Sequence, residues 1–279
     1  PDVSSAASDV YKRQQLGYSS SGEVVQTGKG VSDFHTGDRV VSNGNHAEYV
    51  VVNQNLCTRI PDNTDIKEAS FTVLGSIALH GLRLSETSLG SKVVVIGLGI
   101  IGQLVCRLAE AQGSEVIGID PDTKRTDLSA NFYTSVEEAN MTNVDSVIIT
   151  AATSSNEPIE VATKIARNKA KIVVVGDIPL NISRNDFYYK ELELVVSKSY
   201  GPGRYDKQYE ILGKDYPIEY VRWTENRNFE AFIKLLSQNQ IHLLDLVTEE
   251  VSFENAPSIY KKFSGEDKPL SVVLRYDNK

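Results

Sequence analysis

The chain has 279 residues, of which 41% are hydrophobic and 24% charged, a composition typical of a globular protein with one large or two modest domains. Its net charge of −8 and pI near 5.2 argue against nucleic acid or an anionic membrane surface as a partner. No apolar stretch approaches the roughly 20 residues that cross a bilayer, no secretory signal opens the sequence, and the two cysteines lack a metal-binding spacing. We therefore expect a cytoplasmic protein.

The first fifteen residues differ from the rest of the chain. Residues 1–15 are rich in serine and alanine and then basic, with no period that would bury an apolar face, so we expect a disordered tail. The chain opens with Pro1 rather than methionine, and residues 9–14 resemble the tails that arise when sequencing-adapter DNA is translated. We therefore expect a natural sequence that is truncated at its N-terminus.

Short β-like segments come next. The pattern predicts strands within 22–28, 36–41 and 47–52, each beside turn residues. Residues 65–84 then have helical periodicity, which we expect to be interrupted near Gly75. Short strands followed by a series of alternating strands and helices imply two domains of different type.

The most informative stretch begins with residues 93–96. These four β-branched residues are typical of a strand buried on both faces, and they lead into Gly97-x-Gly99-x-x-Gly102. Apolar residues at helical spacing follow, and Gly113 stands where that helix would end. A lone glycine triplet is weak evidence, but this order of strand, glycine turn and helix is typical of a dinucleotide-binding unit.

Each part of this unit has a chemical task. The three glycines would allow, in order, the tight turn, the close approach of a pyrophosphate and the close packing of helix on strand. Backbone N–H groups at the helix start, at Ile100 and Ile101, would bind the phosphates. A second apolar run, 116–119, ends in Asp120, whose carboxylate would accept hydrogen bonds from the adenosine ribose and repel a 2′-phosphate. The sequence therefore predicts NAD(H) as the cofactor.

The alternation of strands and helices continues after Asp120. A helix is predicted over 157–167, and further strands are predicted over 132–133, 144–151, 171–176 and 192–197. Six strands suffice for a complete doubly wound parallel sheet in the order 3-2-1-4-5-6. The ends of its fourth and fifth strands would border the nicotinamide half of the cofactor, at Thr150, Ala151, Gly176 and Asp177.

Residues 199–228 form an unusual segment beyond the predicted sheet. Tyrosine, arginine and the single tryptophan crowd it without a clean period, and it begins where open α/β sheets bind ligands. It is either a substrate-side loop or an ordered packing segment, and we favour a functional role only for Ser199, Tyr200 and Arg204. Helices over 229–236 and 254–263 and a strand over 269–275 complete the chain.

Four sequence features together resemble the medium-chain dehydrogenase/reductase family. They are Gly37-Asp-Arg, His46-Ala-Glu-Tyr-Val, Ala78-Leu-His-Gly81 and the Gly-Leu-Gly-Ile-Ile-Gly turn. The fold that this implies is α/β, a Rossmann doubly wound parallel sheet plus a partial GroES-like β domain. We expect the GroES-like domain to occupy 16–84, the Rossmann domain with a C-terminal extension to occupy 85–245, and the chain to return to the catalytic domain over 246–279.

The resemblance also implies the chemistry and the partners. The family transfers hydride between NAD(P) and an alcohol or carbonyl group of a small-molecule substrate, often with zinc polarising the oxygen. Residues 199–227 further resemble a subgroup of bi-domain oxidoreductases, often encoded with surface-polysaccharide genes, in which a sugar-dehydrogenase-like module follows. This resemblance implies a polar substrate of the sugar-derived type, and it names two candidate partners, a further copy of the chain in a homo-oligomer and such a downstream module.

The chain departs from the family where zinc would bind. The family's Gly-His-Glu motif aligns with Gly17-Tyr18-Ser19, Leu74 stands where a further ligand would be, and no four-cysteine lobe is present. We therefore expect no metal-binding residues and no tightly bound zinc. A zinc-dependent polyol or threonine-type dehydrogenase and a non-catalytic dinucleotide sensor or scaffold are the alternatives.

Without zinc, another group must donate a hydrogen bond to the reacting oxygen. Tyr18 is the first candidate because it replaces a ligand, Tyr200 is the second, and His46 is a further cleft candidate. The reacting carbon would lie over the edge formed by Thr150, Gly176 and Ser199. Because the family's first strands would precede residue 16, we expect NADH binding to be retained and turnover to be poor.

Overall fold

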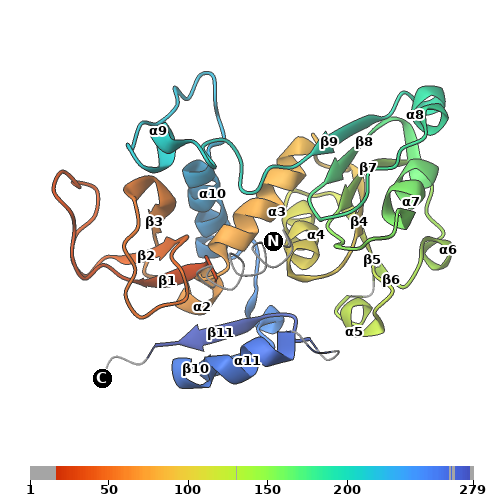
Figure 1. Cartoon of the computed structure of the whole chain (residues 1–279). Helices are drawn as coiled ribbons and strands as arrows, with labels where there is room; N and C mark the ends of the chain where they lie inside the picture. The colour runs from red at the N-terminus through yellow and green to blue at the C-terminus, as the bar shows by residue number, and fades with distance from the viewer. Residues whose placement is uncertain (1–16, 130, 264, 266–267, 277–279) are drawn as a thin grey trace, which may run out of the picture.

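The computed structural model describes residues 17–129, 131–263, 265 and 268–276, so the expected disordered tail at 1–15 lies outside the described residues. The fold is α/β, with a six-stranded parallel sheet, a three-stranded antiparallel sheet and a separate strand pair (Figure 1). No helix in these ranges is long and apolar enough to cross a membrane.

The parallel sheet confirms the predicted doubly wound topology. Its order is β6-β5-β4-β7-β8-β9, which is the expected 3-2-1-4-5-6. The strands are β4 (Lys92–Ile96), β5 (Glu115–Ile119), β6 (Phe132–Tyr133), β7 (Val144–Ile149), β8 (Ala166–Val174) and β9 (Glu193–Val196). The two-residue strand β6 is present as expected, whereas β8 begins earlier than the predicted 171–176.

Strand β4 is buried on both faces because its alternate side chains enter two different cores. Val93 and Val95 pack in one core, whereas Val94 and Ile96 pack in another. The first core also contains side chains of α3 (Thr72–Leu84), α4 (Ile100–Ala111) and α10 (Glu225–Ser237), and the second contains side chains of α7 (Glu157–Ile165). Each fully buried aliphatic side chain stabilises the fold by about 1.5–3 kcal/mol relative to its exposed state. The sheet is therefore covered on both sides, as parallel sheets require.

Helices join the strands of this sheet. The longest is α4 (Ile100–Ala111), and Gly113, with φ of +86°, follows its C-cap as predicted. The others are α5 (Thr123–Thr126), α6 (Val136–Ala139), α7 (Glu157–Ile165) and α8 (Arg184–Lys190). The sequence pattern did not predict α5, α6 or α8, because helices this short show little periodicity.

The antiparallel sheet contains β1 (Ser20–Glu23), β2 (Arg39–Ser42) and β3 (Cys57–Arg59), with the 3-10 turn η1 (Gln54–Leu56) before β3. The predicted strand at 47–52 is wrong, because that segment forms bends and irregular backbone. No described strand pairs with it, and Tyr49 and Val51 are 66% and 105% exposed. Only Val52, at the end of the segment, packs against a buried cluster, so the apolar alternation does not mark a strand here.

The helical region at 65–84 is divided, but at a different place from the predicted one. Helices α2 (Ile66–Ala69) and α3 (Thr72–Leu84) are separated at residues 70–71, and Gly75 lies inside α3. A Cβ at Gly75 would lie 2.1 Å from Cε2 of Phe232 on α10 (Glu225–Ser237). The glycine therefore lets the two helices cross closely and does not break α3.

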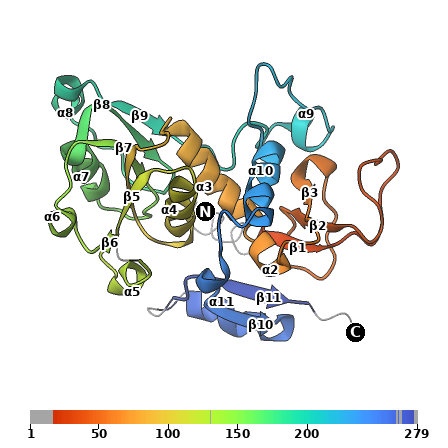
Figure 2. The ribbon, with the colours of Figure 1, turned by 180° about the vertical axis from the view of Figure 1, so that it is seen from behind.

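The C-terminal residues form a small layer of their own. Strands β10 (Glu249–Ser252) and β11 (Val272–Arg275) pair in parallel around α11 (Ala256–Phe263), below the rest of the molecule in Figures 1 and 2. The ion pair between Lys67 Nζ and Glu250, 2.5 Å long, links this layer to α2. The remaining short elements are α9 (Lys207–Glu210), η2 (Leu244–Leu246) and η3 (Phe253–Asn255).

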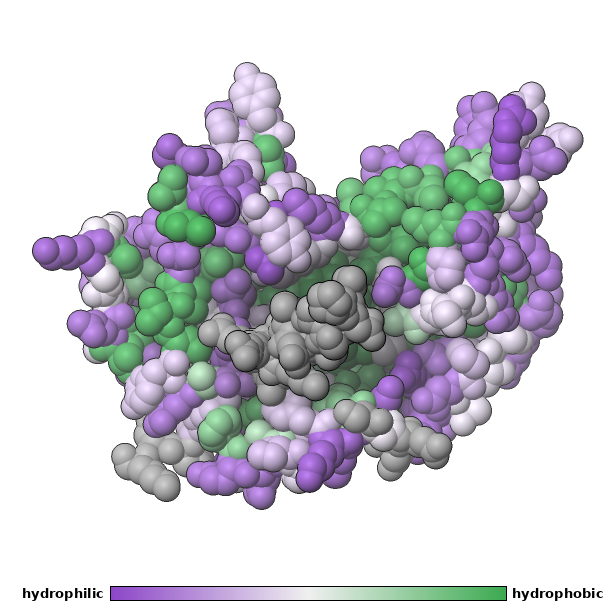
Figure 3. All heavy atoms as spheres, viewed as in Figure 1, coloured by the Kyte–Doolittle hydropathy of each residue, from purple (hydrophilic) through white to green (hydrophobic). Residues whose placement is uncertain are grey.

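Apolar surface gathers at the β9 edge of the parallel sheet. Val196 at the end of β9 is exposed, as are Leu180 and Ile182 in the segment between β8 and α8. Figure 3 shows apolar atoms over the region that carries β8 and β9. Exposed apolar side chains beside an open strand edge are typical of surfaces that another chain covers.

Candidate dinucleotide and substrate site

The glycine turn after β4 has the geometry that a dinucleotide site requires. Gly97 has φ of +97°, and a Cβ on it would lie 2.5 Å from the backbone nitrogen of Ala151. A Cβ on Gly102 would lie 1.9 Å from the carbonyl oxygen of Gly97. Larger residues at these positions would force β4, β7 and α4 apart.

Gly99 differs from the other two glycines because the space in front of it is open. A Cβ there would meet only Nη1 of Arg125, at 3.8 Å. Gly99 is the N-cap of α4, so the backbone N–H groups of Ile100 and Ile101 have no carbonyl partner within the helix. This surface accepts close approach by a ligand and offers donors and a positive dipole end to phosphate.

Asp120 lies at the end of β5, as predicted, and is held in place. Its Oδ2 accepts a hydrogen bond from the backbone N–H of Leu98 at 2.7 Å, and Oδ1 accepts one from that of Asp122 at 2.9 Å. Arg125 Nη1 lies 3.2 Å from Oδ2. The carboxylate is therefore rigid, and the guanidinium offsets part of its charge.

Three of the predicted nicotinamide-side residues meet at the glycine turn. Thr150 Oγ1 donates to the carbonyl oxygen of Gly97 at 2.5 Å, and a Cβ on Gly176 would lie 2.0 Å from the carbonyl oxygen of Ala151. Asp177 is exposed, and its carbonyl oxygen accepts a hydrogen bond from Thr153. Ser199, with φ of +50°, lies beyond β9. The residues that follow β7 and β8 therefore meet beside the glycine turn.

Arg204 lies close to both tyrosine candidates, Tyr18 and Tyr200. Its Cζ lies 5.0 Å from the ring centroid of Tyr200 and 4.1 Å from that of Tyr205, and Nη1 pairs with Glu210 at 2.6 Å. The charges of Arg204 and Tyr205 also act on Tyr18, whose pKa is raised mainly by burial. Arg204, favoured from the sequence, is thus close to both candidates.

The two tyrosines differ in access. The hydroxyl-bearing side chain of Tyr18 is partly exposed, whereas Tyr200 is buried against Phe229 with ring centroids 5.6 Å apart. The Tyr200 hydroxyl accepts a long hydrogen bond of 3.5 Å from Asn43 Nδ2, and burial raises its pKa to about 12. Of the two, Tyr18 is the easier for a substrate to reach.

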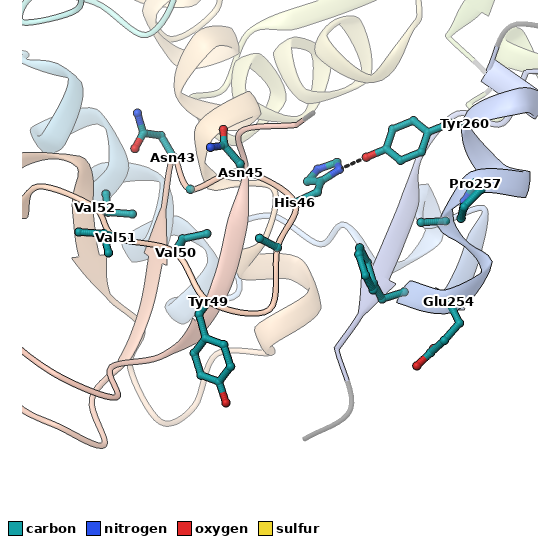
Figure 4. Close-up of a pocket in the computed structure, with 14 residues that line it drawn as sticks. Asn43, Asn45, His46, Tyr49, Val50, Val51, Val52, Glu254, Pro257 and Tyr260 are labelled. Atoms are coloured by element: carbon teal, nitrogen blue, oxygen red, sulfur yellow. Dashed lines mark hydrogen bonds between the residues drawn. The ribbon is translucent and has the colours of Figure 1, made fainter. Parts of the chain in front are cut away.

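His46 belongs to a pocket between the antiparallel sheet and the C-terminal layer. Its Nδ1 lies 2.5 Å from the hydroxyl of Tyr260, and Figure 4 shows these two side chains pointing toward one another. Burial lowers the pKa of His46, so its imidazole is neutral at pH 7. The pocket has a volume of about 1030 Å³, and its lining includes Asn43, His46, Val50, Phe253 and Tyr260. The sequence pattern did not indicate Asn43 or Tyr260.

The residues at the family's metal positions do not fit zinc. Ser19 Oγ donates to the carbonyl oxygen of Ser70, and Leu74 packs against the main core. Zinc needs nitrogen, thiolate or carboxylate donors, which neither Ser19, Leu74 nor Tyr18 supplies in the usual form. Among the residues that the structure describes, no three His, Cys, Asp or Glu side chains converge in a way that could hold a metal ion.

Comparison with known proteins agrees with both parts of this fold. Residues 3–62 match the family described as alcohol dehydrogenase GroES-like domain, and residues 75–186 match the NAD binding domain of D-isomer specific 2-hydroxyacid dehydrogenases. D-guloside 3-dehydrogenase of Escherichia coli K12 is 25% identical, over 93% of this chain and 76% of that protein.

Solved structures resemble more than nine-tenths of the chain in fold. Galactitol-1-phosphate dehydrogenase from Escherichia coli has a TM-score of 0.75 at 21% identity, over 93% of this chain and 84% of that one. A putative zinc-binding dehydrogenase from Sinorhizobium meliloti 1021, bound to NADP, has a TM-score of 0.74 at 20% identity, over 94% and 83%.

The fold, the glycine turn and these matches define the class of this protein, which is an NAD(P)-dependent oxidoreductase that acts on CH–OH groups. More particularly, the chain is a medium-chain dehydrogenase/reductase of the alcohol-dehydrogenase-like type, with a GroES-like and an NAD-binding domain, related to sugar and polyol dehydrogenases.

Proposed function

We propose that the protein interconverts an alcohol and a carbonyl group on a polar, sugar-derived substrate, with NAD(H) as cofactor and without tightly bound zinc. The observation that carries this proposal is the combination of a glycine turn shaped for a dinucleotide with Tyr18, Ser19 and Leu74 at the positions where the family has metal ligands. A bound NAD(H) would supply the hydride acceptor or donor. The sugar character follows from relatives such as D-guloside 3-dehydrogenase and galactitol 1-phosphate 5-dehydrogenase.

We assign the hydrogen bond to the reacting oxygen to Tyr18. A tyrosine hydroxyl is protonated at neutral pH, and burial raises the pKa of Tyr18 further, so this hydroxyl can donate a hydrogen bond to an alcohol or carbonyl oxygen. Arg204 lies close enough to act electrostatically on the same hydroxyl. His46 and Tyr260 are proposed to bind substrate hydroxyl groups in the adjoining pocket, because both carry polar atoms on its wall.

The Tyr18→Phe substitution should slow oxidation of bound NADH by a keto-sugar by about 10²-fold or more, the usual contribution of a positioned acid. The measurement is single-turnover NADH oxidation, which detects even slow chemistry. The Kd for NADH should change less than twofold, because Tyr18 is assigned to the substrate and not to the cofactor. The matched control is Tyr189→Phe on α8, which is 78% exposed and should change neither quantity. Equal rates for Tyr18→Phe and the unmodified protein would refute the assignment.

Purified protein should contain well under one zinc per chain by elemental analysis. The reason is the donor set, since Tyr18, Ser19 and Leu74 cannot supply the three ligands of a catalytic site. Chelators should leave any oxidation of NADH unchanged. Stoichiometric zinc that survives dialysis would instead support a zinc-dependent polyol dehydrogenase.

NADH should bind more tightly than NADPH by roughly tenfold or more, because an opposed carboxylate and 2′-phosphate cost about 1–3 kcal/mol. Arg125 offsets part of the Asp120 charge, so Arg125→Gln should widen the preference by weakening NADPH binding. Fluorescence titration of both cofactors with both proteins measures this. The assignment of Asp120 fails if NADPH binds the unmodified protein as tightly as NADH does.

A further inference from the structure

The single tryptophan of the chain lies between two arginines. The Cζ of Arg83, from α3, is 3.3 Å from the ring centroid of Trp223, and the Cζ of Arg222 is 3.8 Å from it. Both distances lie well within the roughly 6 Å range of a cation–π contact with an aromatic face. Two guanidiniums this close to one centroid would overlap on the same face, so they occupy opposite faces of the indole.

These two cations have no anionic partner in the described part of the chain. Arg83 Nε donates to Oδ1 of Asn228 at 3.0 Å, and neither guanidinium forms an ion pair with a described carboxylate. Elsewhere the arginines of this chain commonly pair with acids, as Arg227 does with Asp215. The charge at Trp223 is therefore uncompensated.

The site is built by buried structure and is not a chance meeting of flexible side chains. Asn228 is fully buried at the start of α10, and its Nδ2 donates to the carbonyl oxygen of Tyr200 at 3.0 Å while its Oδ1 orients Arg83. A Cβ on Gly201 would lie 3.2 Å from Nδ1 of His80, so the backbone loop closes directly over the histidine.

The electrostatics of the neighbouring groups agree with this excess of positive charge. Burial, and then the charge of Arg222, lower the pKa of Arg83 to about 10. Burial, and then the charge of Arg83, lower the pKa of His80 to about 4. An anion bound here would relieve the repulsion between the two arginines.

We propose that Arg83 and Arg222, held on opposite faces of Trp223, form a binding site for an oxyanion group of a small molecule, of the phosphate or carboxylate type. Guanidiniums on the two faces of one indole leave room at the ring edge, where oxygens of one anion can accept hydrogen bonds from both arginines. The proposal rests on Arg83, Trp223 and Arg222 alone, and it does not depend on the dehydrogenase activity.

Trp223 is also the probe, because it is the only tryptophan of the chain. Its fluorescence should change saturably when the protein is titrated with inorganic phosphate, glucose 6-phosphate or gluconate at constant ionic strength, with sodium chloride as the blank. The Arg222→Gln substitution lies at an exposed position and should not affect folding, and we expect it to weaken anion binding at least fivefold. The double variant, Arg83→Gln with Arg222→Gln, should weaken anion binding at least fiftyfold. The control is Arg184→Gln, whose guanidinium stacks on Tyr188 at 4.5 Å and should leave binding unchanged.

The outcomes separate the ligand types. Saturation by phosphate and glucose 6-phosphate but not gluconate supports a phosphate site, whereas saturation by gluconate as well supports a general oxyanion site. Tighter binding of glucose 6-phosphate than of phosphate supports an organic ligand. The proposal is overturned if no ligand gives a saturable change, if chloride gives the same change, or if the double variant binds as tightly as the unmodified protein.

Discussion

Gly99→Asp should abolish measurable NADH binding while leaving the fold intact. The position is open, so the new side chain meets no backbone, but it occupies the place where a pyrophosphate must approach the start of α4. Two like charges about 4 Å apart repel by about 4 kcal/mol at an effective dielectric constant of 20, which corresponds to roughly 10³-fold weaker binding. Isothermal titration with NADH measures the effect.

The matched control for this variant is Gly28→Asp. A Cβ at Gly28 meets nothing within 4 Å, so the same charge is added in open space far from the glycine turn. Its NADH affinity should equal that of the unmodified protein. The aspartate of Gly99→Asp could also lose NADH binding indirectly, by forming an ion pair with Arg125. Gly99→Leu cannot form that ion pair, so a loss of NADH binding in this variant as well would show that the side chain itself excludes the pyrophosphate. Retained NADH affinity in both Gly99 variants would show that the pyrophosphate does not bind at this turn.

Glu225→Gln should stabilise the protein at alkaline pH and change little at acidic pH. Glu225 is 0% exposed, and neither carboxyl oxygen has a hydrogen-bond partner among the described residues. Burial, and then the charge of Glu210, raise its pKa to about 8 from an ordinary value of 4.5. Between these two pKa values the folded protein keeps a proton on Glu225 that the unfolded chain has released. The contribution of Glu225 to the free energy of unfolding is therefore fully present below pH 4.5 and is lost as the pH rises toward 8.

The free energy of unfolding from urea titrations between pH 5 and 9 measures this difference. Glutamine has the shape of the protonated acid and does not titrate, so the gain should grow with pH to about 2–4 kcal/mol at pH 8.5. Glu230→Gln, an exposed position on the same helix, is the control and should show no such slope. A pH-independent difference between Glu225→Gln and the unmodified protein would contradict a protonated buried carboxyl.

The parallel sheet and the cofactor turn could be predicted because their signals are local. Strand β4 and the turn after it lie within a dozen residues, and the fit of Gly97 and Gly102 against neighbouring backbone explains why no other residue stands there. The place of Asp120 could also be predicted, because it directly follows the next strand, β5. Even the short β6 was indicated by two aromatic residues at the right distance.

The substrate side depends on contacts that no local pattern encodes. His46 meets Tyr260 from a helix 214 residues away, and the pairing of Asn43 with Tyr200 joins residues 157 apart. The segment 47–52 alternates like a strand but has no described partner strand. Gly75 looks like a helix breaker in sequence, yet its role is set by Phe232, which comes from another helix. Tertiary packing decides each of these cases, so the sequence alone could not.

The most direct test of a zinc-independent NAD(H) oxidoreductase is single-turnover oxidation of NADH by the metal-stripped protein. Protein freed of metal by a chelator and loaded with NADH is mixed with a panel of keto-sugars and other polyol oxidation products, and NADH absorbance is followed. We expect at least one member of the panel to oxidise the bound NADH stoichiometrically, with no effect of added zinc. NADH that binds but is oxidised by no member, or only after zinc is restored, would contradict the account.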